Sequence, residues 1–175
     1  MNDQDNIGKY LRKAIDVGKK VPNAENFVSK LESLLEKGTE DQNFADSLIG
    51  LTHDELKDTY SKIYGAENPK KSLMQKIGLK KTEIDMQELT SYVTKQTYLT
   101  GVMLEVINYS QTVSDGVPIG AVMFVIQDWP ANLEKIKQLK EKGAPFDKNL
   151  MIEIDILYNR DTINTLKERY MKPKS

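Results

Sequence analysis

Residues that could do chemistry are few in this chain, and they follow no catalytic pattern. There is one histidine and no cysteine, which excludes thiol nucleophiles, disulfides and cysteine-ligated metals. His53 lies in the sequence Thr-His-Asp-Glu at residues 52–55, which is typical of a helix capping box. We therefore expect His53 to lie at a helix start and not to act as an acid or base. No glycine-rich phosphate loop is present, and we expect no catalytic residue, metal ligand or cofactor.

Two carboxylates, Glu153 and Asp155, form the strongest candidate for a reactive pair. They alternate with isoleucines between residues 150 and 158. On a β-strand they would share one face, where they could bind a cation or act as an acid–base pair. On a helix they diverge, and a solvated surface is then the simpler interpretation. A cation-dependent enzyme that uses this pair is one alternative function.

A basic stretch between Lys70 and Lys81 holds five lysines and no acidic residue. Such a stretch could bind phosphates, so nucleic-acid binding is a second alternative function. No arginine or aromatic residue lies among the lysines, as base contact usually requires. The chain as a whole has 25 basic and 26 acidic residues and hence no general attraction to nucleic acid. We favour a solvated connector.

Hydrophobic periodicity predicts that the chain before this connector is helical, because apolar residues recur at spacings of three and four. A glycine or a turn sequence follows most of these periodic stretches. The capping box at 52–55 is expected to begin a new helix. The predicted helices span about residues 6–19, 23–38, 39–49 and 52–65.

The chain after the connector is also expected to be helical. Residues 85–113 indicate either two antiparallel helices or one long bent helix. A turn follows at 114–118, and then an apolar helix over 121–126. Asp128 is expected to cap a further helix that ends at Gly143. The last helix is expected to begin at Asp161.

The lone tryptophan, Trp129, allows two interpretations. At the start of the helix after Asp128 it would either pack on the core or anchor a partner, as exposed aromatic residues often do. Along the same helix, we expect Leu133, Ile136 and Leu139 to face inward.

The stretch 115–147 resembles the ankyrin repeat. Residues 115–119 look like the turn and helix start of that family, with a valine in place of its threonine. Residues 132–139 and the Lys-Gly-Ala at 142–144 look like its second helix and stop. A weak internal repeat at a shift of 30 residues agrees with stacked helical hairpins. The resemblance implies partner binding through turn tips and the inner helix face, at Ser114, Asp115, Val117, Gln127, Asp128 and Trp129.

The predicted fold is all-α, with an N-terminal helical bundle packed on a short ankyrin-like stack. The alternative is an α+β fold with a small sheet made from residues 121–127 and 150–158. We expect an N-terminal part at 1–67, a basic connector at 68–84 and a C-terminal part at 85–175, or one continuous domain.

We expect a non-enzymatic protein–protein interaction module, such as an adaptor, effector or inhibitor, that presents a rigid helical surface. Its partner would be a protein, and self-association through an uncapped stack end agrees with this view. Membrane insertion is not expected, because the longest apolar run is shorter than the roughly 20 residues that a bilayer requires. The acidic N-terminus shows no secretory signal, which indicates a soluble cytoplasmic protein or one exported without a classical signal peptide.

Overall fold

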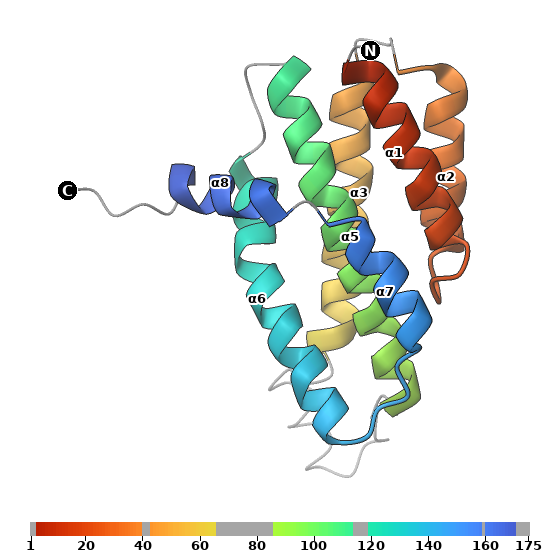
Figure 1. The fold of residues 1–175 in the computed structure, drawn as a ribbon, viewed down its shortest axis with the longest axis vertical. Helices are drawn as coiled ribbons and strands as arrows, with labels where there is room; N and C mark the ends of the chain where they lie inside the picture. The colour runs from red at the N-terminus through yellow and green to blue at the C-terminus, as the bar shows by residue number, and fades with distance from the viewer. Residues whose placement is uncertain (1–2, 40–42, 66–85, 114–118, 159, 171–175) are drawn as a thin grey trace, which may run out of the picture.

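The computed structural model describes residues 3–39, 43–65, 86–113, 119–158 and 160–170. The predicted connector, with Lys70 and Lys81, lies outside this range, as do Ser114, Asp115 and Val117. The described residues form seven helices and no strand, so the all-α prediction is confirmed (Figure 1). In chain order the helices are α1 (Asp3–Gly18), α2 (Glu25–Lys37), α3 (Phe44–Tyr64), α5 (Met86–Val113), α6 (Ile119–Glu141), α7 (Lys148–Ile156) and α8 (Arg160–Tyr170).

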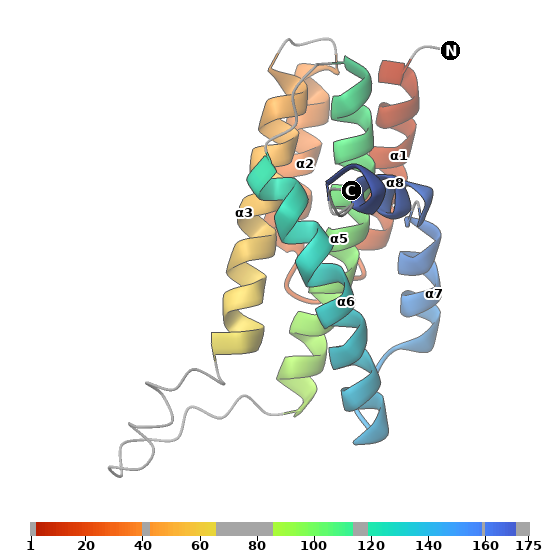
Figure 2. The same cartoon turned by 90° about the vertical axis from the view of Figure 1, so that its left-hand side faces the viewer.

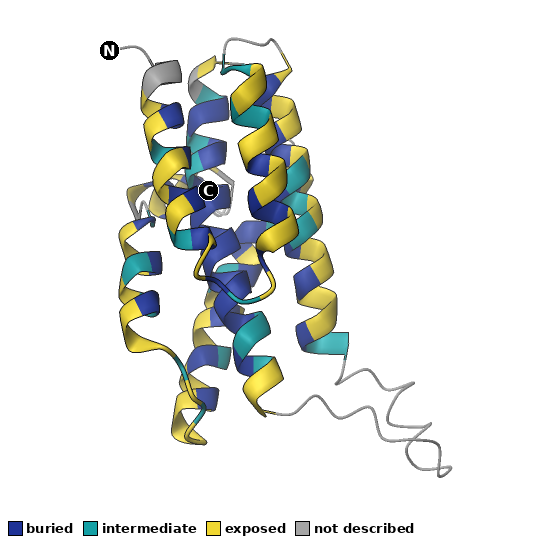
Figure 3. Ribbon diagram, turned by 90° about the vertical axis from the view of Figure 1, so that its right-hand side faces the viewer, coloured by how far each residue is buried: buried dark blue, intermediate teal, exposed yellow. Residues whose placement is uncertain are grey.

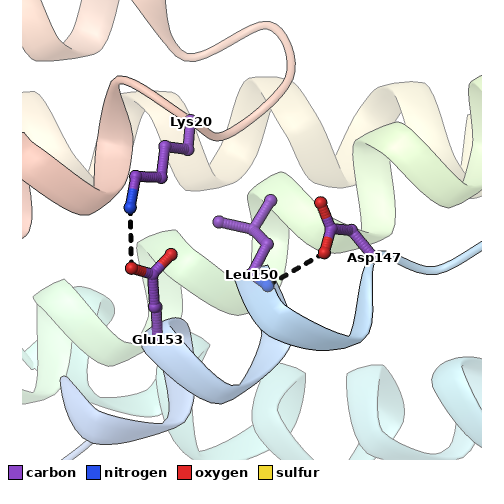
Figure 4. Close-up of polar contacts among 4 residues, drawn as sticks. All are labelled: Lys20, Asp147, Leu150 and Glu153. Carbon is purple, nitrogen blue, oxygen red and sulfur yellow. Dashed lines mark hydrogen bonds and ion pairs between the residues drawn. The ribbon is translucent and has the colours of Figure 1, made fainter.

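The alternative fold with a small β-sheet is wrong, since residues 121–127 lie inside α6 and residues 150–156 inside α7. The start of α7 is fixed locally. The carboxylate of Asp147 accepts a hydrogen bond of 3.1 Å from the backbone N–H of Leu150 and caps the helix (Figure 4). An aspartate placed just before the segment therefore favours helix over strand, despite the alternating pattern.

Helix α5 runs through the middle of the molecule, and α1, α3, α6, α7 and α8 pack around it (Figure 2). Every residue from 93 to 104 is buried, and Figure 3 shows the buried positions gathered on the inward faces of the helices. A helix buried on all sides has no amphipathic stripe, which explains the irregular pattern over 85–113. Residues 86–113 form one helix of 28 residues. Among the described helices, none is both long and apolar enough to cross a membrane.

The threonines in the middle of α5 are compatible with burial because their hydroxyl groups bond within the helix. Thr90, Thr94, Thr97 and Thr100 each donate to the backbone carbonyl four residues earlier, at 2.6 to 2.8 Å. A buried hydroxyl without a partner would cost free energy, and these bonds remove that cost.

Helix α3 passes without a break through the predicted capping box, so the prediction of two helices over 39–65 is wrong. Thr52 is fully buried, and its hydroxyl donates to the carbonyl of Leu48 at 2.8 Å. Glu55 forms an ion pair of 3.1 Å with Lys95 of α5, and their side chains are only 16 % and 6 % exposed. The residues that resemble a helix cap therefore connect α3 to α5.

One hydrophobic core joins the described helices on both sides of the predicted connector. The rings of Phe27 and Tyr98 meet edge to face with centroids 6.0 Å apart, a favourable arrangement for two aromatic rings. The Tyr98 hydroxyl also donates to the carbonyl of Ala14 at 2.6 Å. Core residues come from all seven described helices, for example Leu11, Phe27, Leu48, Tyr98, Val125, Ile154 and Leu166.

Gly18, the last residue of α1, lies directly against Tyr98. A Cβ atom at this position would overlap the Tyr98 hydroxyl and lie 2.7 Å from Cγ2 of Val28. We expect Gly18→Ala to lower the free energy of unfolding by about 2 kcal/mol, because overpacking displaces core side chains. In α3, a Cβ on Gly50 would have no neighbour within 4 Å, so Gly50→Ala should raise stability by about 0.5–1 kcal/mol. Denaturant unfolding compares the two variants, and a stable Gly18→Ala protein would contradict this packing.

Helix α6 is continuous where a loop was predicted, and Asp128 is not a helix N-cap. Pro130 lies inside α6 and lacks the N–H that would bond the carbonyl of Ile126. The Asp128 carboxylate instead accepts hydrogen bonds from Gln96 at 3.1 Å and Thr100 at 3.3 Å on α5. Where the ankyrin-like motif implied two helices, residues 119–141 form one. The contact with α5 outweighs the helix-breaking tendency of the proline.

Candidate functional site

An apolar groove with a volume of about 860 Å³ lies between α6 and α7. The two helices are joined at one end through residues 142–147, as Figure 1 shows. Helix α5 contacts both of them, and its residue Thr97 lines the groove. A hollow of this size is typical of binding sites in proteins.

Exposed apolar side chains are concentrated on the two walls of this groove. Leu133 of α6 is 46 % exposed, and Ile152 and Ile156 of α7 are 61 % and 73 % exposed. Three of the seven large hydrophobic side chains exposed in the described residues therefore lie here. The prediction that Leu133 faces inward is wrong, because α6 turns this side toward the groove. Gathered apolar surface of this kind is typical of interaction sites in proteins.

The polar atoms near the groove floor are already paired with one another. The Tyr158 hydroxyl donates to the carbonyl of Thr97 at 2.5 Å. The Thr97 hydroxyl donates to the carbonyl of Val93 and accepts from Nδ2 of Asn132 at 2.6 Å. The floor therefore offers apolar contact and few free hydrogen-bonding groups.

Charged residues line the groove unevenly. Lys140 of α6 and Lys148 of α7 are both exposed and lie at the end closed by residues 142–147. Asp155 lines the groove further along α7. At the other end of the α6 wall, Nζ of Lys167 lies 5.1 Å from the ring centroid of Trp129. The closed end of the groove is thus the end where each wall contributes a lysine.

Two of the residues predicted to bind a partner, Trp129 and Gln127, are at least partly exposed. Trp129 is half-buried, lines the groove and also packs on the main core, so it does pack on the core, and its role as an anchor for a partner stays a prediction. Gln127 is exposed one helical position away from Asp128. Ser114, Asp115 and Val117 lie outside the described residues, and their role stays a prediction.

Asp128 lies in a buried polar cluster between α5 and α6 and is only 3 % exposed. Burial raises its pKa from 3.8 to about 6, against the opposing effect of the hydrogen bonds from Gln96 and Thr100. One side-chain oxygen each of Asp128, Gln96 and Asn132 has no hydrogen-bond partner in the described residues. A partner could contact Asp128 only if α5 and α6 separated.

The two carboxylates of the proposed reactive pair do not share a site. Glu153 forms an ion pair of 2.7 Å with Lys20, at the end of the first helical hairpin (Figure 4). It also borders a separate hollow that does not include Asp155, which lines the α6–α7 groove. Among the described residues, no group of three or more His, Cys, Asp or Glu side chains could hold a metal ion.

His53 lies in the middle of α3 and not at a helix start as predicted. Its ring meets that of Phe124 of α6 at a centroid distance of 5.5 Å. Desolvation lowers its pKa, Lys57 adds to the effect and Asp54 opposes it. The histidine therefore contributes to the contact between α3 and α6.

Sequence reasoning found Trp129 but missed the groove residues Ile152 and Ile156. A signal was present, because apolar residues at 150, 151, 152, 154, 156, 157 and 158 exceed what one helix face can bury. The excess must be exposed, and in α7 it is exposed along the groove.

Comparisons with protein families, with curated proteins and with solved structures find no match to this chain. The resemblance of residues 115–147 to an ankyrin repeat stays a prediction from the sequence.

Proposed function

We propose that this protein is a non-enzymatic interaction module that binds a protein partner in the α6–α7 groove. The observation that carries the proposal is the exposure of Leu133, Ile152 and Ile156 around one hollow of about 860 Å³. Apolar surface that remains in water is unfavourable, and a partner that covers it gains the free energy of burial. Trp129 adds an aromatic residue of the type that often dominates binding energy.

The contacts that hold α7 in place support a preformed groove. The Tyr10 hydroxyl lies 3.1 Å from the carbonyl of Leu157 and 3.2 Å from that of Gly101. Tyr158 bonds to Thr97 of α5, and Glu153 pairs with Lys20. A groove held open before binding reduces the entropy lost on association.

The enzymatic alternative has less support than binding. It needed Glu153 and Asp155 on one face of a strand, whereas both lie on α7 and line different hollows. The nucleic-acid alternative depends on Lys70 to Lys81, which lie outside the described residues.

The proposal predicts that one charge in the groove strongly weakens partner binding. A displayed library of random peptides of about 15 residues would be selected on the full chain. We expect apolar sequences to be enriched and Ile152→Glu to weaken their binding at least tenfold, because a buried unpaired carboxylate opposes contact. Fluorescence anisotropy with the selected peptides would measure the dissociation constants.

Ile119→Glu is the matched control, since Ile119 is 63 % exposed on α6 and does not line the groove. This variant should bind the peptides as the unmodified chain does. Equal weakening by both substitutions, or a library that yields no binder, would contradict the proposed function.

A further inference from the structure

We infer that the partner of the groove is a short amphipathic helix with acidic residues at the end that lies beside Lys140 and Lys148. This inference rests on the proposed function and names the shape and charge of the partner.

The groove walls favour a partner that satisfies its own backbone. Apart from the carbonyl of Ile126 and the groups at the helix ends, α6 and α7 use their backbone N–H and C=O groups internally, so they offer no edge to an extended peptide. The floor groups of Thr97 and Tyr158 are already bonded to each other. An extended segment would bury unpaired amide groups, which is costly, whereas a helix pairs them within itself.

The dimensions of the groove favour a helix over a single acyl chain. At about 1.5 Å per residue, the α6 wall from Trp129 to Lys140 is about 16 Å long, which matches about three helical turns. A helix with its side chains is about 10 Å across. It can contact the floor and also cover the rim side chains of Leu133 and Ile156, which are 46 % and 73 % exposed. A narrow acyl chain on the floor would leave these side chains in water.

The charges of the groove favour acidic residues at one end of the partner helix. Lys140 and Lys148 come from opposite walls and are exposed, and no ion pair joins either to the described part of the chain. Acidic partner residues are therefore favoured beside these two lysines.

The test uses two synthetic helical peptides of about 15 residues with the same apolar face. One carries a pair of glutamates at one end, and the other carries lysines in their place. Anisotropy titrations with the full chain should show about tenfold tighter binding of the glutamate peptide at low salt, with the difference shrinking as salt rises. Circular dichroism should show that the bound peptide is helical.

Charge reversal of the groove provides the decisive comparison. In the double variant Lys140→Glu/Lys148→Glu the preference should switch to the lysine peptide. The control, Lys13→Glu/Lys137→Glu, makes the same change in net charge at exposed lysines that do not line the groove, and it should keep the original preference.

The outcomes separate this inference from the proposed function. Equal binding of both peptides, or no switch on charge reversal, would overturn the acidic helix while groove binding stands. Binding of library peptides that stay extended would overturn the helix alone. If no peptide binds and oleate, used as an acyl probe, binds in an Ile152-dependent way, both the inference and the protein-partner function are wrong.

Discussion

Replacing Glu55 by alanine is expected to lower the free energy of unfolding by about 3–5 kcal/mol, because it leaves a buried ammonium group without its partner. Nζ of Lys95 lies 3.1 Å from Oε2 of Glu55, and the two side chains are 6 % and 16 % exposed. Water can replace little of the lost interaction at such a position. The pair connects α3 to the central helix α5, so the loss should affect the whole fold.

An exposed ion pair on the same helix provides the control. Lys62 and Asp58 of α3 are 3.4 Å apart, with side chains 48 % and 59 % exposed. Asp58→Ala should change stability by about 0.5 kcal/mol or less, since exposed pairs contribute little. Denaturant unfolding at about pH 7 measures both variants. A loss from Glu55→Ala no larger than that from Asp58→Ala would show that Lys95 does not depend on Glu55.

A double variant separates the loss of the pair from the loss of packing. Glu55→Leu with Lys95→Met replaces the ion pair by apolar side chains of similar size. Such replacements of buried pairs are often neutral or stabilising, so the double variant should recover most of the stability lost in Glu55→Ala. A double variant as unstable as Glu55→Ala would indicate that apolar side chains cannot replace the ion pair in the contact between α3 and α5.

The ion pair of Glu55 with Lys95 also shows why sequence patterns located some helices and missed the length of others. Helices α1 and α2 were predicted, because each has apolar residues along one side, which is a local feature of the sequence. The end of α2 was also predicted, since Gly38 adopts a φ of 97° there. Thr52 and Asp128 resemble helix caps because a cap and a buried polar contact both require a short polar side chain. Only the contact of each helix with α5 distinguishes the two cases, and that contact is not encoded locally.

The groove was missed for a related reason. Periodicity can assign Leu133 and Ile152 to the apolar sides of helices, but it cannot say that α6 and α7 leave a groove between them. The all-α prediction makes residues 150–158 helical, and the surplus of apolar residues there is visible in the sequence. Whether such a surplus is buried or exposed depends on the position of a neighbouring helix, which is a property of the tertiary structure.

Asp128→Asn is expected to stabilise the protein at neutral pH, in contrast to the loss expected for Glu55→Ala. Burial raises the pKa of Asp128 from 3.8 to about 6, so the folded protein binds the proton of this carboxyl group more tightly than the unfolded chain does. The stabilisation from the bound proton is fully present below about pH 4 and is lost as the pH rises through about 6. At about pH 7.5 the ionised group costs up to about 3 kcal/mol. Asparagine has nearly the same shape, can accept from Gln96 and Thr100, and carries no charge.

The pH dependence of the difference tests its cause. Unfolding free energies of Asp128→Asn and of the unmodified chain should agree near pH 4 and diverge between about pH 4 and 6, and above that range the variant should stay more stable by about 2–3 kcal/mol. Asp16→Asn removes an exposed carboxylate of α1 and should give a change within about 0.5 kcal/mol at every pH. A constant difference between Asp128→Asn and the unmodified chain would mean that packing, and not the buried charge, sets the effect. A loss of stability at neutral pH would mean that the ionised carboxylate is matched by the cluster of Gln96, Thr100 and Asn132.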